Sequence, residues 1–154
     1  MGYSLTPTEY FWIDSSKNIQ SIVGDKDATT NWTTANLLIG SNVKLQLKFA
    51  TENVENVVVK VNIGGEEQYV SPNEFKKEED KYVVVIDSLT SKQYDTAIVA
   101  QLYENGEQVG GTLTYSVNSY LYRNAEKEEH SEEMKALLKA LYVYGETMKA
   151  YFEN

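Results

Sequence analysis

The chain has 154 residues, a formal net charge of -9 from 14 Lys plus Arg against 23 Asp plus Glu, and no cysteine. The lack of cysteine excludes disulfides, thiol nucleophiles and thiolate metal sites, and the acidic balance disfavours nucleic acid and anionic membranes as partners. No apolar stretch is long enough to span a bilayer as a helix, so we expect no membrane insertion, and this length fits one domain over 1–154.

The first predicted strands precede residue 50. Two of them lie near Thr8 to Asp14 and Trp32 to Ile39. Residues 42–49 then alternate strictly, with Val43 starting the apolar set and lysines among the polar set. Period two of this kind predicts a strand with one buried face and one face in water.

The next segment predicts a hairpin and a doubly buried strand. Residues 56–63 are mostly apolar, half of them valine, and Gly64-Gly65 predicts the turn into a strand that ends at Val70. The charged stretch 76–81 predicts a loop. Residues 82–86 are apolar at every position, so we expect this strand to be covered on both faces.

A second hairpin closes the β-rich part. Residues 94–103 predict a strand, Asn105-Gly106 is the strongest turn signal in the chain, and 109–115 predict the returning strand. Seven to eight strands at this spacing are typical of an antiparallel β-sandwich, which we expect over residues 8–115.

Residues 116–154 predict a helical tail that is integral to the fold. Ser116 caps a short helix that ends at Asn124, and Ser131 begins a second helix with an apolar seam. Gly145 interrupts that seam, which predicts close approach to a neighbour. We expect that neighbour to be the strand at 82–86, with the tail packed on one sheet.

Residues 89–115 resemble the last hairpin of fibronectin type III and related immunoglobulin-like domains. Leu89, Tyr94, Ala97 and Ala100 carry the resemblance, although the leucine and tyrosine stand one residue closer together than in the usual fibronectin form. The resemblance implies an immunoglobulin or fibronectin-like fold for this mainly β chain.

The tail resembles a poorly characterised C-terminal module of secreted or cell-surface proteins of anaerobic gut bacteria. The resemblance rests on Tyr115-Ser116-Val117, Tyr144-Gly145 and Tyr151-Phe152. Glu146 to Ala150 depart from the small residues and glutamines that the module commonly has there. The resemblance implies a secreted or cell-surface location, and it supplies no binding residues.

No residue pattern supports catalysis, so we predict a non-enzyme without cofactor or metal. His130 is the only histidine, and 23 acidic residues make any carboxylate pair uninformative. Asp25 and Asp27 alternate as in a calcium loop, but Thr30 and Asn36 stand where an EF-hand needs glycine and glutamate. Calcium binding near the two aspartates is left open.

Aromatic rings suggest the function. Tyr10, Trp12 and Trp32 are the candidate ligand-binding residues, because flat rings stack on sugars when they face solvent, although tryptophans in sandwiches are more often core residues. We therefore expect a non-catalytic carbohydrate-binding module that binds polysaccharide. The alternative is a structural or protein-interaction module that binds a surface protein through a sheet edge. A monomer is expected in both cases.

Overall fold

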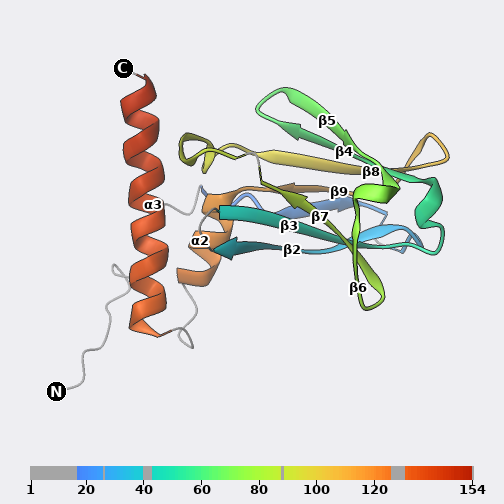
Figure 1. Cartoon of the computed structure of the whole chain (residues 1–154), viewed down its shortest axis with the longest axis horizontal. Helices are drawn as coiled ribbons and strands as arrows, with labels where there is room; N and C mark the ends of the chain where they lie inside the picture. The colour runs from blue at the N-terminus through green and yellow to red at the C-terminus, as the bar shows by residue number, and fades with distance from the viewer. Residues whose placement is uncertain (1–16, 26, 40–42, 88, 126–130, 154) are drawn as a thin grey trace. The chain divides into compact units, whose positions relative to one another are not determined.

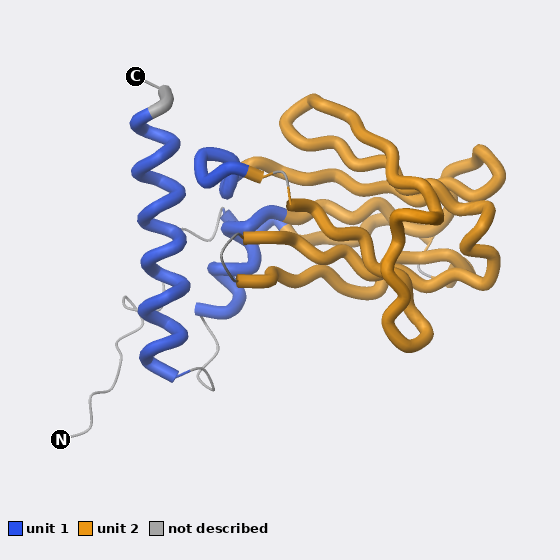
Figure 2. The backbone as a smooth tube through the Cα atoms, in the orientation of Figure 1, with its two compact units in different colours: residues 1–19, 90–95, 116–154 blue, residues 20–89, 96–115 orange. Residues whose placement is uncertain are grey.

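The computed structural model describes residues 17–25, 27–39, 43–87, 89–125 and 131–153. The chain divides into two compact units, which Figure 2 colours separately. The sandwich unit comprises residues 20–89 and 96–115, and the helical unit comprises 1–19, 90–95 and 116–154. The segment 90–95, which lies between two strands in sequence, thus belongs to the helical unit.

The sandwich unit contains two antiparallel sheets (Figure 1). Both sheets are built from neighbours that run in opposite directions. The five-stranded sheet has the order β1 (Ser21–Gly24), β9 (Glu107–Tyr115), β8 (Ile98–Glu104), β4 (Val57–Ile63) and β5 (Glu66–Val70). The four-stranded sheet has the order β2 (Asn31–Ile39), β3 (Val43–Ala50), β7 (Lys81–Ile86) and β6 (Lys76–Glu78).

This strand order is that of the immunoglobulin fold. With β2 as strand A, the four-stranded sheet reads A-B-E-D, and β9-β8-β4-β5 reads G-F-C-C′. Strand β1 is an addition beside β9. The expected mainly β, antiparallel immunoglobulin-like sandwich is therefore confirmed, with nine strands among the described residues in place of seven or eight.

Two of the nine strands were not predicted, and one prediction remains outside the structure. Strand β1 has four residues and β6 has three, which is too short for a period-two pattern to be recognised. Strand β6 falls within 76–81, where a loop was expected. The strand predicted at 8–14 lies outside the described residues.

The core of the sandwich follows the alternation of the sequence. In β3, Leu45, Leu47 and Phe49 are fully buried, while the polar residues between them, Gln46 and Lys48, are partly exposed. The same alternation recurs on the facing sheet. Its fully or almost fully buried side chains are Val57, Val59, Val61, Ile98, Ala100, Leu102, Leu113 and Tyr115.

The hairpin turns form where glycine permits a left-handed backbone. Asn105 and Gly106 have φ values of 54° and 83°, which is the geometry that joins β8 to β9 with a two-residue turn. The prediction for this hairpin is confirmed. The start of β8 was predicted too early, because the chain continues as a turn and a bend through residues 94–96 after the 3-10 turn η4 (Ser91–Gln93), and the strand begins only at Ile98.

The helical unit contains α2 (Val117–Ala125) and α3 (Glu132–Glu153), close to the predicted helices. Ser116 Oγ accepts a hydrogen bond from Ser119 N at 3.0 Å, and Ser131 Oγ accepts one from Met134 N at 3.1 Å. Both predicted N-caps are thus present. Within the part of the chain described, no helix is long and apolar enough to cross a membrane.

Gly145 approaches a different neighbour from the one expected. A Cβ atom placed on it would lie 2.6 Å from Tyr94 Cδ2 and 3.2 Å from Ser91 O. The three atoms nearest to that position all belong to Ser91 and Tyr94, so the expected close contact with the strand at 82–86 is wrong. The glycine instead lets α3 lie directly against the ring at the entrance to β8.

Candidate interaction surface

Trp32 is a core residue. Only 4% of it is exposed, and its ring makes a T-shaped contact with the ring of Phe49 at a centroid distance of 5.7 Å. The two residues are cross-strand partners, and such partners share one face of a sheet, so Trp32 points inward with Phe49. The expectation that the ring of Trp32 faces solvent and can stack on a sugar is therefore wrong. Tyr10 and Trp12, the other two candidates, lie outside the described residues, as does His130.

Asn31 fixes the start of β2 against the opposite sheet. Its Oδ1 accepts hydrogen bonds from Gly111 N and from Trp32 N, both at 2.9 Å, and its Nδ2 donates to Asp25 O at 3.0 Å. Gly110 lies so close that a Cβ there would be 2.4 Å from Thr30 O. This corner of the sandwich is closed, and its side-chain hydrogen bonds join β2 to β9.

The Asp25 loop uses its carboxylate for a turn. Asp25 Oδ1 accepts a hydrogen bond from Asp27 N at 3.0 Å, and both residues are exposed. This bond is the Asx-turn that aspartate often forms with the second residue after it. No three histidine, cysteine, aspartate or glutamate side chains among the described residues are grouped so that they could hold a metal ion.

Beyond the corner, β2 forms one edge of the four-stranded sheet. An extra residue at Thr33 shifts its register, and from Thr34 to Ile39 it pairs residue by residue with β3. Among the described strands β2 pairs with β3 alone. We call this six-residue segment, Thr34–Ile39, the β2 edge.

The β2 edge lacks the charge or brevity that protects the other sheet edges. Strand β5 carries Glu66 and Glu67, β6 consists of two lysines and a glutamate, and β1 has four residues. Strand β2 has nine residues and no charge, within an uncharged run from 28 to 43. Edges are usually protected from pairing with other chains by charge, proline or shortness, so the β2 edge is the least protected of the four.

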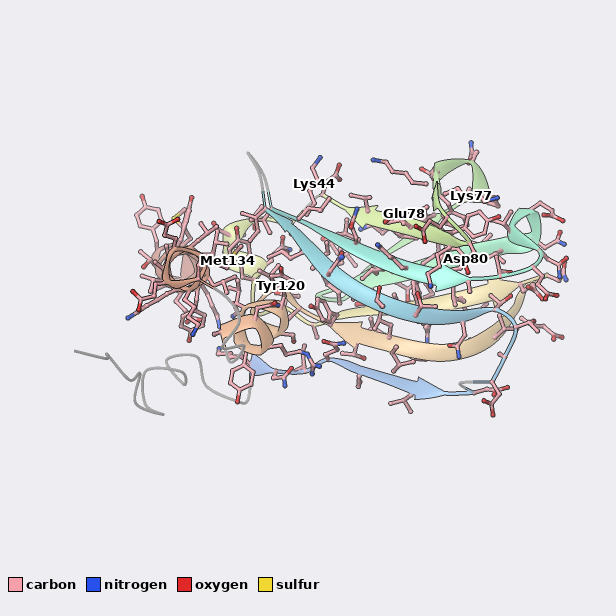
Figure 3. The ribbon with its side chains drawn as sticks, turned by 90° about the horizontal axis from the view of Figure 1, so that it is seen from below. Lys44, Lys77, Glu78, Asp80, Tyr120 and Met134 are labelled. Carbon is pink, nitrogen blue, oxygen red and sulfur yellow. The ribbon has the colours of Figure 1, made fainter. Side chains whose placement is uncertain are left out.

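Two lysines accompany the β2 edge on the neighbouring strand. Lys44 lies opposite Leu38, and Lys48 lies opposite Thr34. Leu38 is 43% exposed, so this side of the strand pair faces away from the core. Figure 3 shows the two sheets as layers, with Lys44 and Glu78 on the outer side of the four-stranded sheet. We call Lys44 and Lys48 the lysine row.

The two sheets differ in charge, although the whole chain is acidic. The strands of the four-stranded sheet carry five lysines and one glutamate, Glu78. The strands of the five-stranded sheet carry one lysine, Lys60, and four glutamates. Lys60 is paired, because its Nζ lies 3.2 Å from Glu67 Oε1, and the hydrogen bond to Glu67 raises the pKa of Lys60 above its ordinary value. The four-stranded sheet is the basic side of the sandwich unit.

Neither the hydrogen bonds of the buried Asn31 nor the exposed β2 edge was predicted from the sequence. The contact of Asn31 with Gly111 joins residues 80 positions apart, and no local pattern announces it. The β2 edge had a signal, namely the length of the uncharged run from 28 to 43. Comparison with known protein families, with curated proteins and with solved structures finds no match to this chain.

Proposed function

We propose that the chain is a non-catalytic module of a secreted or cell-surface bacterial protein and that it binds another polypeptide through an open sheet edge. The observation that carries this proposal is the β2 edge, which is uncharged, whereas the other edges of the two described sheets are charged or short. A polypeptide partner is favoured because an edge strand offers backbone donors and acceptors that an added strand matches.

The distribution of exposed rings in the sandwich unit supports a polypeptide partner over a polysaccharide. Trp32 is buried. Among the described residues of the sandwich unit, one aromatic ring is strongly exposed, that of Tyr69, which is 61% exposed. A single exposed ring does not form the flat or concave platform on which sugar rings stack.

A binding experiment on the intact chain tests this function. The immobilised chain is incubated with secreted and surface proteins of its source organism, and retained polypeptides are identified, purified and titrated against the chain by calorimetry. We expect saturable binding of one purified polypeptide that free chain competes away. The proposal is wrong if none of the retained proteins binds the chain once it is purified, while a polysaccharide retards the chain in affinity electrophoresis.

A polysaccharide ligand is a second candidate, and one observation on α3 favours it. Tyr144 and Tyr151 are 48% and 71% exposed, and their separation of seven residues places them on one side of the helix, two turns apart. Affinity electrophoresis in gels containing starch, xylan, glucomannan or cellulose tests it. Retardation that Tyr144→Ala and Tyr151→Ala both abolish would support this candidate, and retardation by none of the four would remove it.

A further inference from the structure

The backbone of the β2 edge determines what class of molecule fits it. In an antiparallel strand, alternate residues direct their N–H and C=O groups to opposite sides. Because β2 pairs with β3 on one side among the described strands, every second residue of Thr34–Ile39 directs these groups away from the sheet. The spacing of such groups matches another extended polypeptide, and no polysaccharide carries the same alternating donors and acceptors.

The lysine row determines the charge of that polypeptide. Strands β2 and β3 contain two lysines and no acidic residue, in a chain that has 23 acidic residues. Lys44 forms no ion pair among those found in the described residues, and Lys48 pairs with Glu78, which is itself exposed. An acidic strand beside β2 would meet no carboxylate on these two strands. It would lie two strand spacings, about 9.6 Å, from β3, a gap that the side chains of Lys44 and a glutamate can span together.

The two faces of β2 determine the pattern along the partner. Thr34, Asn36 and Leu38 face the same side as the lysine row, because each is paired with Lys48, Gln46 or Lys44. The opposite face carries Ala35, Leu37 and Ile39, of which Leu37 is buried. An added strand therefore needs acidic side chains on the outer face and apolar side chains on the inner face, in alternation.

We propose that the β2 edge binds an extended acidic segment of another polypeptide, which adds a fifth strand to the four-stranded sheet and places its carboxylates on the side of Lys44 and Lys48. This inference rests on the proposed function and specifies its partner. The partner strand carries alternating apolar and acidic residues over about six positions, the length of Thr34–Ile39.

A synthetic peptide tests the proposal on the full chain. The probe has nine residues, alternately valine and glutamate, and its binding is measured by calorimetry at low salt. Three probes are compared: the parent peptide, the same peptide with valine and lysine, and the parent peptide N-methylated at every residue. We expect binding of the parent peptide alone, because the lysine peptide has the wrong charge and the N-methylated peptide has no N–H group to donate along either side.

A pair of charge reversals locates the site. Lys44→Glu changes the lysine row, and Lys139→Glu makes the same change at an exposed position of α3 in the helical unit. We expect Lys44→Glu to weaken binding about fivefold, since an exposed ion pair contributes up to about 1 kcal/mol. Lys139→Glu should change binding by less than about twofold, because residue 139 lies outside the sandwich unit. It is a matched control, since it changes the net charge of the chain by the same amount.

Each alternative occupant gives a different result. If the N-methylated peptide binds as tightly as the parent peptide, the site attracts charge without strand addition. If polygalacturonate also binds, the ligand is an anionic polysaccharide. Either result overturns the proposal. Dimerisation of the full chain that Asn36→Lys abolishes would place a second copy on the β2 edge and also overturn it. If a purified partner protein binds the chain while the peptide does not, the proposed function stands and the assignment to β2 is wrong.

Discussion

Lys48 and Glu78 form an ion pair that spans strand β7. Lys48 Nζ lies 3.0 Å from Glu78 Oε1, and the two residues come from β3 and β6, the strands on either side of β7. Lys48 is also the cross-strand partner of Val83, which is 1% exposed. The aliphatic part of the lysine therefore covers Val83 while its ammonium group reaches the carboxylate.

We expect the stem of Lys48, more than its charge, to stabilise the sandwich unit. Lys48→Met retains the stem and should cost less than about 1 kcal/mol, because Glu78 is largely exposed and exposed pairs contribute little. Lys48→Ser removes the stem and should cost about 1–2 kcal/mol more, since each buried methylene contributes about 0.8 kcal/mol. Urea denaturation measures both variants. Equal losses for Met and Ser would show that the charge is responsible.

The hydrogen bonds of Asn31 give a sharper prediction for the corner of the sandwich. Asn31→Ala leaves the buried N–H groups of Gly111 and Trp32 without their acceptor, and it should lower the free energy of unfolding by about 2–3 kcal/mol. Asn36→Ala is the control on the same strand, because Asn36 Oδ1 is buried without a hydrogen-bond partner. We expect that variant to be neutral or slightly stabilising in thermal denaturation, and a loss equal to that of Asn31→Ala would contradict the assignment.

The sequence predicts the strands of this fold better than its surface. Alternation located Val43–Phe49 because half of that strand faces water. Gly64-Gly65 and Asn105-Gly106 located the hairpin turns, because glycine and asparagine tolerate the left-handed backbone that such turns require. The orientation of Trp32 was not predictable, because the extra residue at Thr33 shifts the register and its partner Phe49 is set by long-range pairing. The contacts of Asn31 with Gly111 and of Gly145 with Tyr94 also join distant segments.

Gly145 allows a prediction for the helical unit. In Gly145→Leu the new side chain must displace the ring of Tyr94, and overpacking of this kind costs about 1–3 kcal/mol. Ala140→Leu adds a side chain at an exposed position of the same helix and should change stability by less than about 0.5 kcal/mol. Circular dichroism at the helix band during thermal denaturation compares the two. A helix signal equally stable in both variants would mean that Gly145 and Tyr94 are not in close contact.

Tyr94 makes stability depend on pH in the alkaline range. Burial first, and the nearby Tyr144 second, raise the pKa of Tyr94 above its ordinary value of 10.0. The unfolded chain therefore loses the proton of Tyr94 at lower pH than the folded chain does. The contribution of protonated Tyr94 to folding stability is complete below the unfolded pKa, and it is lost as the pH rises through the folded pKa. We expect the midpoint temperature of thermal denaturation to decrease as the pH is raised from about 9 to about 11. The decrease should be smaller in Tyr94→Phe. A midpoint that falls equally in both would exclude Tyr94 as the cause.

Amide hydrogen exchange along β2 tests most directly whether this strand is an open edge that accepts a partner. In the free chain, alternate amides of Thr34–Ile39 should be protected by β3 while those between them exchange quickly, since β2 pairs with β3 alone among the described strands. Addition of the valine and glutamate peptide should slow the fast amides and leave those of β5, at the edge of the other sheet, unchanged. Protection of all six residues in the free chain, or fast exchange that the peptide leaves unaltered, would contradict the account.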